Sequence, residues 1–323
     1  MKILVIGGAG YIGSHVVKAL MQKQHEIIVF DNLSTGLRQN LFKKNKFIYG
    51  DILVKKDIEF AFSSGFDACI HLASLKSVNE SMKNPEKYLE NNILGTLNIL
   101  NFATKYNCKN IVFSSSASIF GNPQKLPIDE NHSKNPINFY GFTKLTIENY
   151  LEWYSNFKGI NYSALRYFNA AGYDVDGEIL GLEQIPTNLI PIIMEAACGI
   201  RNEVSIFGDD YDTLDGTCIR DYVHVTDLAD AHVKALKYIA SNNTNIKLNL
   251  GSEVGTSVKE VIDVARKVTG KEIKTKIVER RLGDPAELLA ISKLAKEIIG
   301  WKPKYSDIET IIKTTWDAYL KNM

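Results

Sequence analysis

Tyr140 and Lys144 form the first pair of residues in this chain whose types and spacing could do chemistry. In a helix, positions i and i+4 lie on one face, so the two side chains would be neighbours. A free tyrosine, with a pKa of about 10, is a weak base at neutral pH. A neighbouring ammonium stabilises the phenolate and lowers that pKa. The pair therefore predicts a phenol that takes up and returns a proton.

Three consecutive serines, Ser114, Ser115 and Ser116, end a predicted strand upstream of that pair. Ligands of doubly wound sheets bind at the carboxyl ends of parallel strands, which is where these hydroxyls would lie. A serine there would hydrogen-bond the same substrate oxygen that Tyr140 protonates or deprotonates. The alternative for Tyr140 and Lys144 is a surface pair at i and i+4, and the alternative for the serines is a polar strand end that caps the next turn. The position of both motifs favours the chemical interpretation.

A glycine-rich turn follows the first predicted strand and contains Gly7, Gly10 and Gly13. Gly7 permits a tight turn, Gly10 lets the backbone approach a pyrophosphate, and Gly13 lets the helix and the strand pack closely. The helix N-terminus then faces the anion. Because the turn opens a series of alternating strands and helices, dinucleotide binding is favoured over a simple tight turn.

Asp31 ends the second predicted strand. A carboxylate at this place accepts hydrogen bonds from both ribose hydroxyls and repels a 2′-phosphate. The residue therefore predicts NAD rather than NADP as the cofactor, although Arg38 lies nearby in the sequence. With a nicotinamide cation bound, the Tyr140 phenolate would gain a second stabilising charge.

The elements that must position these residues alternate along the first half of the chain. Short β-branched runs predict strands at 3–6, 27–30, 47–49, 68–72, 111–114 and 162–166, and amphipathic stretches predict helices at 12–23, 54–62, 85–106 and 140–157. This alternation predicts an α/β fold with a doubly wound, parallel Rossmann sheet.

After about residue 170 the pattern loosens, and Gly, Pro and Asp punctuate shorter elements. We expect a Rossmann domain over 1–170 and a smaller C-terminal α/β substrate domain over 171–323. A return of the chain to the main sheet near 225–250 stays open.

The composition excludes several classes of function. The chain has 38 Lys plus Arg and 37 Asp plus Glu, so its net charge is +1. This balance does not indicate binding to nucleic acid or to a membrane surface. No stretch approaches the ~20 uninterrupted apolar residues of a membrane span. The four cysteines are far apart and form no Cys/His cluster, which argues against disulfides and structural metal. We expect a cytoplasmic enzyme without a metal.

Taken in order, these motifs resemble the extended short-chain dehydrogenase/reductase superfamily. Within it the chain closely resembles the UDP-glucose 4-epimerases from end to end. The likeness is carried by Gly-Gly-Ala-Gly-Tyr-Ile-Gly-Ser-His at 7–15, Asp-Asn-Leu at 31–33, His-Leu-Ala at 71–73, Lys-Ser-Val at 76–78, Asn-Asn at 91–92, Arg-Tyr-Phe-Asn at 166–169, Asp-Gly-Thr at 215–217, Arg-Asp-Tyr-Val-His-Val at 220–225 and Arg-Arg-Leu-Gly-Asp at 280–284.

The resemblance implies a role for each matching residue. It implies catalysis by Ser116, Tyr140 and Lys144. It implies NAD binding by Gly7, Gly10, Tyr11, Ile12, Gly13, Asp31, Asn32, Asp51, Ile52, Leu72, Ala73, Lys76, Asn91, Tyr140, Lys144, Tyr167 and Phe168. It implies UDP-sugar binding by Ser116, Asn169, Asn188, Leu189, Phe207, Arg220, Tyr222, Arg281, Asp284 and Leu288. Two separated arginines suit a diphosphate, because guanidinium forks match phosphate oxygens.

Leu288 is the informative position for substrate width. In the family this position helps to line the sugar pocket, and a bulky Tyr there is associated with exclusion of N-acetyl groups. Leu is smaller, so the resemblance implies room for UDP-GlcNAc and UDP-GalNAc beside UDP-glucose and UDP-galactose. The family also implies a homodimer.

Three other functions are considered. Nucleotide-sugar 4,6-dehydratases carry an Asp-Glu pair in the segment where this chain has Ala117 and Ser118. A decarboxylase of UDP-uronic acids needs a cationic partner for the carboxylate, and no residue is identified for it. A non-catalytic, dinucleotide-sensing protein commonly loses the Tyr/Lys pair, whereas Tyr140 and Lys144 are both present. Epimerisation is the function that the sequence favours.

Overall fold

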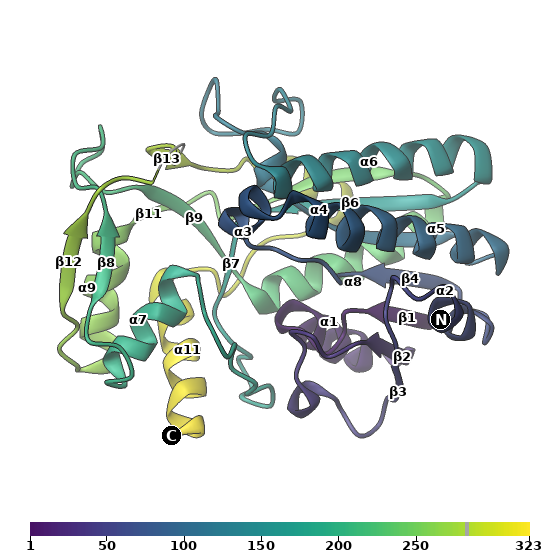
Figure 1. Cartoon of the computed structure of the whole chain (residues 1–323), viewed down its shortest axis with the longest axis horizontal. Helices are drawn as coiled ribbons and strands as arrows, with labels where there is room; N and C mark the ends of the chain where they lie inside the picture. Colours follow the sequence, from purple (N-terminus) through teal and green to yellow (C-terminus); the bar gives the residue numbers. More distant parts are fainter. Residues whose placement is uncertain (282–283) are drawn as a thin grey trace.

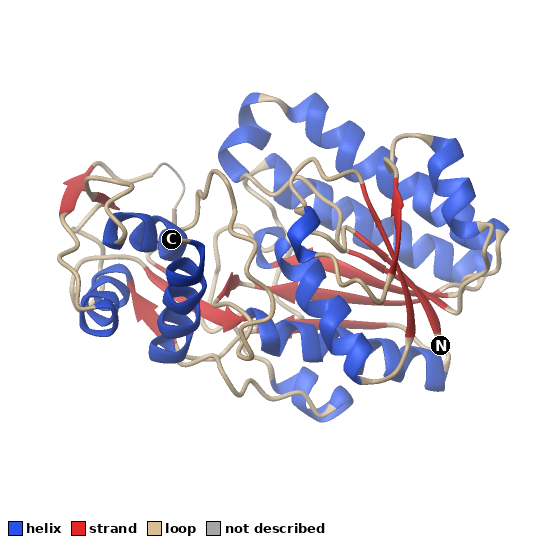
Figure 2. Ribbon diagram, turned by 90° about the horizontal axis from the view of Figure 1, so that it is seen from below, coloured by secondary structure: helices blue, strands red, loops and turns tan. Residues whose placement is uncertain are grey.

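The protein is described by a computed structural model that covers residues 1–281 and 284–323. A large sheet of parallel strands forms its centre (Figures 1 and 2). Its spatial order is β10 (Ile246–Leu250), β6 (Asn161–Tyr167), β5 (Asn110–Ser116), β4 (Ala68–His71), β1 (Lys2–Ile6), β2 (Glu26–Asp31) and β3 (Lys46–Tyr49). The α/β Rossmann fold expected from the sequence is confirmed.

Helices cover both faces of the large sheet. On one face lie α1 (Tyr11–Gln22), α8 (Val225–Asn242) and α10 (Lys293–Ile299), which share one core cluster with the inward side chains of the strands. On the other face lie α2 (Lys55–Phe62), α5 (Gly95–Lys105) and α6 (Phe139–Lys158). Because both faces are covered, central strands such as β1, with the sequence KILVI, are apolar throughout rather than alternating.

The chain re-enters the large sheet after it has left it. Strand β10 pairs in parallel with β6, and α8 packs against α1. The residues after 170 therefore contribute to both parts of the molecule, and the return near 225–250 is present as α8 and β10.

The stretch 85–106 departs from the single helix expected there. It consists of α4 (Pro85–Tyr88), a π-helical segment (Leu89–Leu94) and α5. A further short helix, α3 (Val78–Lys83), precedes it. Each part is helical, so the periodicity of the sequence did not reveal the break. π-Helical turns often occur at functional sites, and this one carries Asn91 and Asn92.

The remaining elements form a smaller part at one end of the large sheet (Figure 1). A four-stranded sheet contains β7 (Asn169–Ala171), β9 (Ile219–His224), β11 (Gly255–Ser257) and β13 (Glu287–Leu288). A two-stranded sheet contains β8 (Val204–Phe207) and β12 (Thr275–Val278), and α7 (Leu189–Ala197), α9 (Val258–Thr269) and α11 (Ile308–Asn322) enclose a separate core. Short 3-10 turns occur at Arg38–Asn40 and Ala117–Ile119.

Candidate active site

Helix α6 presents the Tyr140 and Lys144 pair from its first two turns. The helix begins at Phe139 because the Asn138 side chain accepts a hydrogen bond from the Gly141 N–H at 2.8 Å, which caps the N-terminus. Lys144 is buried, and its Nζ donates to the Ser114 carbonyl at 2.8 Å. The same Nζ lies 5.7 Å from the centre of the Tyr140 ring. The helix thus holds the ammonium beneath the phenol.

The serines at the end of β5 complete this group. The Ser116 hydroxyl acts to lower the pKa of the Tyr140 phenol. Ser116 Oγ accepts from the Ser118 N–H at 3.1 Å, which fixes its position. Ser114 Oγ is hydrogen-bonded to the Tyr167 hydroxyl. The three residues expected to be catalytic are therefore brought together at the carboxyl end of β5.

Burial dominates the protonation of both members of the pair. It raises the pKa of Tyr140 to about 12, and the hydrogen bond from Ser116 offsets only part of that rise. Burial also lowers the pKa of Lys144 to about 7. Burial weakens the support that Lys144 gives to the phenolate, because the lysine loses solvation together with the tyrosine. The lowering of the phenol pKa by Lys144 and a nicotinamide cation together stays a prediction.

The glycine turn between β1 and α1 has no space for a side chain at Gly7 or Gly13. Gly7 has a φ of +83°, and a Cβ on Gly13 would lie 2.0 Å from the Gly7 oxygen. A Cβ on Gly10 would meet nothing nearer than 3.3 Å. No side chain caps the N-terminus of α1, whose first residues are Tyr11 and Ile12. The open face at Gly10 and these uncapped N–H groups fit a pyrophosphate.

Asp31 is held rigidly beside the same turn. Its Oδ2 accepts from the Ala9 N–H at 3.0 Å and its Oδ1 from the Leu33 N–H at 2.8 Å. Burial raises the pKa of this carboxyl, and the two hydrogen bonds act against the rise. Asn32 donates to Asp51 Oδ2 at 2.8 Å, which links the ends of β2 and β3. Each carboxylate oxygen keeps capacity for a further donor, such as a ribose hydroxyl.

Asn92 and Glu183, which were not assigned to the site from the sequence, contact the loop and side chain of two residues that were, Asn91 and Lys76. Asn92 accepts from the Leu75 N–H at 2.9 Å and donates to the Leu75 carbonyl at 3.1 Å, while Asn91 donates to Asn92 at 3.0 Å. Lys76 forms a salt bridge with Glu183. The adjacent Asn pair was the only signal for Asn92, and nothing in the sequence links residue 76 to residue 183.

The other residues expected around the cofactor contact several separate parts of the protein. Tyr11 donates its hydroxyl to the Gly172 carbonyl, so it ties α1 to the segment after β7. Ile52 is buried. Leu72 packs against the core cluster beneath α1 and α8, and Ala73 against the cluster on the opposite face. Phe168 packs against a small cluster of Ile119, Phe120 and Ile128.

The residues expected to bind the sugar nucleotide are distributed over the smaller part of the molecule. Arg220 Nη2 donates to Asp284 Oδ1 at 2.5 Å, and Leu288 pairs with Arg220 in the register of β9 and β13. Asn169 pairs with Tyr222 in the register of β7 and β9. Their neighbours Leu282 and Gly283, which belong to the resembling motif, lie outside the described residues.

The second arginine, Arg281, follows strand β12. The Arg281 guanidinium lies 3.9 Å from the centre of the Phe207 ring, at the end of β8. Asn188 and Leu189 are at the start of α7, where no side chain caps the helix. Arg220 on β9 and Arg281 in the loop after β12 therefore offer two separate cationic groups, which suits a diphosphate.

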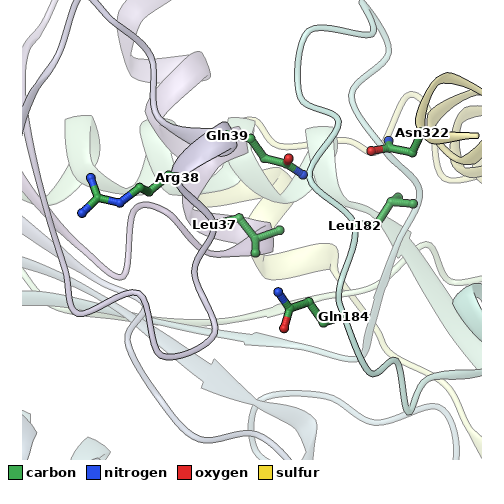
Figure 3. A pocket seen from close by; sticks show the side chains of 6 residues that line it. All are labelled: Leu37, Arg38, Gln39, Leu182, Gln184 and Asn322. Atoms are coloured by element: carbon green, nitrogen blue, oxygen red, sulfur yellow. The ribbon is translucent and has the colours of Figure 1, made fainter.

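A cavity of about 440 Å³ lies elsewhere, between the loop after β2 and the loop before α7. Figure 3 shows its lining, with the Arg38 side chain directed away from Leu182 and Asn322. The lining residues are Leu37, Arg38, Gln39, Leu182, Gln184 and Asn322. None of them belongs to the Tyr140 group, so this cavity is separate from the candidate chemistry.

Comparison with known proteins places the chain in a family. The sequence model described as "NAD dependent epimerase/dehydratase family" matches residues 3–251. The chain belongs to this family. A UDP-glucose 4-epimerase of Lacticaseibacillus casei is 45% identical over 318 residues, which are 98% of this chain and 96% of the relative.

Two solved structures agree with this assignment. The UDP-glucose 4-epimerase of Brucella ovis in complex with NAD has a TM-score of 0.95 and 43% identity, with 98% of this chain and 97% of that chain covered. The UDP-Glc/GlcNAc 4-epimerase of Campylobacter jejuni has a TM-score of 0.87 and 39% identity, with 99% of each chain covered. The resemblance to UDP-glucose 4-epimerases seen in the sequence is confirmed.

Among the described residues, no three His, Cys, Asp or Glu side chains are grouped so that they could hold a metal ion. Within the same residues, no helix is long and apolar enough to cross a membrane.

Proposed function

We propose that this protein is an NAD-dependent epimerase that inverts the C4 hydroxyl of UDP-linked hexoses. The observation that carries the proposal is the grouping of Ser116, Tyr140 and the buried Lys144 at the carboxyl end of β5, at the sheet edge that also carries the glycine turn. Relatives that match the whole chain, from Lacticaseibacillus casei and Brucella ovis, are UDP-glucose 4-epimerases. UDP-glucose and UDP-galactose are the proposed substrate pair.

NAD fits the residues at the glycine turn. Gly10 and the N-terminus of α1 would receive the pyrophosphate, and Asp31 would accept the ribose hydroxyls. Asn32, Asp51 and Ile52 lie at the ends of β2 and β3, where the adenosine half would sit. Lys144 would contact the second ribose. When bound, NAD supplies a hydride acceptor for C4 and a positive charge beside the phenol.

The chain's own residues supply the proton chemistry. Tyr140 removes the proton of the C4 hydroxyl and returns it after the sugar has turned over. Ser116 hydrogen-bonds the same oxygen and aligns it with the phenol. Lys144, held by the Ser114 carbonyl, stabilises the phenolate once the site is occupied. The proton that Tyr140 takes when the 4-keto sugar forms is returned when the C4 hydroxyl forms again, so the complete cycle involves no net gain or loss of a proton.

The binding of UDP must be strong while the hexose stays free to rotate. Arg220 and Arg281 would hold the diphosphate, and Asn188 with Leu189 would face the nucleotide from the start of α7. Phe207 and Asp284 fix the two arginines before substrate arrives. Asn169, Tyr222 and Leu288 would line the space in which the sugar turns.

Replacement of Tyr140 by Phe tests this function. With UDP-galactose as substrate, we expect wild-type protein to yield UDP-glucose and Tyr140→Phe to lose at least about 100-fold in kcat, since general acid–base groups contribute about that much or more. Tyr154→Phe on the same helix is the matched control and should keep its rate. Product analysis by NMR decides the outcome. Near-normal turnover by Tyr140→Phe would refute the assignment.

Leu288 supports a wider substrate range. It is half-buried in β13 and packs on the cluster of Ile119, Phe120 and Ile128. Since Leu is smaller than Tyr, space remains for a 2-acetamido group, so we expect UDP-GalNAc to be epimerised as well. The Campylobacter relative is a UDP-Glc/GlcNAc 4-epimerase.

The ratio of kcat/KM for UDP-GalNAc to that for UDP-galactose measures this width. Leu288→Tyr should lower the ratio by about tenfold or more, the size of effect that steric discrimination in a pocket gives. A conservative Leu288→Met should leave the ratio near the wild-type value. Rejection of UDP-GalNAc by wild-type protein would refute the wider range.

A homodimer is the proposed assembly. On α6, Trp153 and Phe157 are exposed at 62% and 69%, and their rings stack 5.1 Å apart. A second copy would cover this pair together with the exposed Leu94 beside α5. Light scattering on wild-type protein and on Trp153→Lys should give a dimer and a monomer, respectively. A monomeric wild-type protein would contradict the proposal.

We also propose the compartment and the division of labour within the chain. All four cysteines are free thiols, which is typical of the reducing cytoplasm. Residues 1–170, completed by α8 and β10, would bind NAD, and the rest of 171–323 would bind the UDP-sugar. Galactose metabolism is the setting in which this reaction would serve.

A further inference from the structure

We propose that Ser115, Glu148 and Arg166 form a positioning cluster that sets the distance between Tyr140 on α6 and Ser116 on β5. The three residues would act on the reaction through the groups they hold, without touching the substrate. The inference rests on the proposed epimerase function. It concerns residues to which neither the sequence analysis nor the proposed mechanism gives a role.

The cluster is a fully bonded ionic group inside the protein. Arg166 donates to Glu148 twice, from Nε to Oε1 at 2.9 Å and from Nη2 to Oε2 at 2.7 Å. Ser115 donates its hydroxyl to Glu148 Oε1 at 2.5 Å. The Arg166 and Glu148 side chains are each only 1% exposed. Such two-pronged, charge-assisted bonds fix orientation as well as distance.

Each member of the cluster adjoins a proposed catalytic group. Glu148 follows Lys144 by one helical turn and Tyr140 by two, so the three lie along one face of α6. Ser115 lies between Ser114, whose carbonyl accepts a hydrogen bond from Lys144, and Ser116, whose hydroxyl acts to lower the pKa of Tyr140. The Ser115–Glu148 bond therefore joins α6 to β5 next to the reacting groups.

Arg166 extends the cluster away from the substrate side. It lies on β6, opposite Ser115 in the register of the two strands, and its Nη1 donates to the Glu130 carbonyl at 3.3 Å. Glu130 in turn accepts from the Asn249 N–H on β10 at 2.8 Å. The carboxyl ends of three adjacent strands are thereby fixed relative to α6.

Stability alone does not account for such a group. A buried ion pair commonly contributes no more than well-packed apolar residues of similar volume, because removing two charges from water offsets their attraction. The cluster fixes the position of α6 relative to β5. We infer that this position determines whether the Ser116 hydroxyl and the Tyr140 phenol can hydrogen-bond the same substrate oxygen.

Removal of the Ser115 hydroxyl is the mildest test. We expect Ser115→Ala to lower kcat for UDP-galactose by about tenfold, because a small misplacement of catalytic groups costs one to two orders of magnitude. KM for UDP-galactose and the amount of bound NAD should stay within about twofold of wild type, since neither depends on the phenol–hydroxyl spacing.

Ser163→Ala is the matched control. Ser163 lies on β6, is fully buried, and its hydroxyl has no hydrogen-bond partner among the described residues. The control therefore removes a buried hydroxyl from the same sheet without breaking a hydrogen bond. Its kcat should equal that of wild type, measured well below the unfolding temperature of each variant.

A second variant removes both charges together. Glu148→Gln combined with Arg166→Met leaves no unpaired buried ion, so the protein should fold, and its kcat should fall at least as far as in Ser115→Ala with KM retained. Equal kcat values for Ser115→Ala, Ser163→Ala and wild type would overturn the positioning role. A change in KM alone would overturn it as well. A wild-type protein without turnover would instead overturn the proposed function.

Discussion

The Tyr140 phenol lies in surroundings that favour its neutral form. Burial raises its pKa to about 12, against the effect of the Ser116 hydroxyl, and burial brings the pKa of Lys144 down to about 7. At neutral pH the lysine is therefore only partly charged. The pair gains a strong electrostatic preference for phenolate when the nicotinamide cation of NAD is added.

The phenol titration follows from this balance. Without NAD the difference in phenolate absorbance between wild type and Tyr140→Phe should titrate at a pKa of about 12. Oxidised NAD should move that pKa downward, because a nearby positive charge favours the ionised phenol. Equal titration curves with and without NAD would contradict the account. Subtraction of the Tyr140→Phe curve removes the signal of the other tyrosines.

At the scale of elements, the turn between β1 and α1 contains glycines that are needed for two different reasons, the fold and the ligand. Gly13 is required by the fold, because a Cβ there would lie 2.0 Å from the Gly7 oxygen. Gly10 is required by the proposed ligand, because its Cβ would meet no protein atom nearer than 3.3 Å.

The two alanine variants should therefore differ in kind. Gly13→Ala should lower the free energy of unfolding by about 2 kcal/mol or more through a backbone clash. Gly10→Ala should leave stability within about 0.5 kcal/mol but weaken NAD binding, since the pyrophosphate can no longer approach. Urea unfolding and calorimetric NAD titration measure both effects. Equal loss of stability in the two variants would refute the distinction.

Sequence patterns predicted some of these elements and missed others. Strands such as β1 and β2 were predicted to within one residue at each end, because a buried parallel strand reads as a short apolar run. The π-helical segment Leu89–Leu94 escaped prediction, since a single wide turn hardly alters helical periodicity. The Tyr140 and Lys144 pair was found from its spacing, but spacing does not reveal burial, which raises the pKa of Tyr140 and lowers that of Lys144.

At the scale of the whole molecule, a buried ion pair joins the large sheet to the smaller part. Lys18 on α1 donates to both oxygens of Asp174 at 2.8 and 2.7 Å, and to Asp176 at 2.8 Å. The Asp174 side chain is 3% exposed. No local pattern predicts such a contact, because its partners are 156 residues apart in the chain. The clusters around Ser115 and Leu288 were hidden for the same reason.

Loss of the Lys18 ammonium should destabilise the protein. Lys18→Met leaves the Asp174 carboxylate buried without its partner, which costs about 3 kcal/mol in free energy of unfolding. Lys18→Met combined with Asp174→Leu should recover part of this loss. Urea unfolding of both variants at neutral pH makes the measurement. A double variant less stable than the single one would contradict the pairing.

The pH dependence of this pair has a definite sign. Burial acts to raise the pKa of Asp174, but the hydrogen bonds from Lys18 and the Glu178 N–H, together with the positive charge of Lys18, outweigh it, so the pKa lies below its usual value. The stabilisation is thus complete at neutral pH and is lost as the pH falls through the folded-state pKa. Wild-type protein should lose more stability on acidification than Lys18→Met, in the same unfolding assay.

The central claim is that one hydride leaves C4 of the sugar and returns to the same carbon on its opposite face, while Tyr140 moves the proton. UDP-galactose carrying deuterium at C4 tests this most directly, with NMR analysis of the product. We expect the product to be UDP-glucose with the deuterium retained at C4. Deuterium found at C6, as in a 4,6-dehydration, or lost to solvent would contradict it.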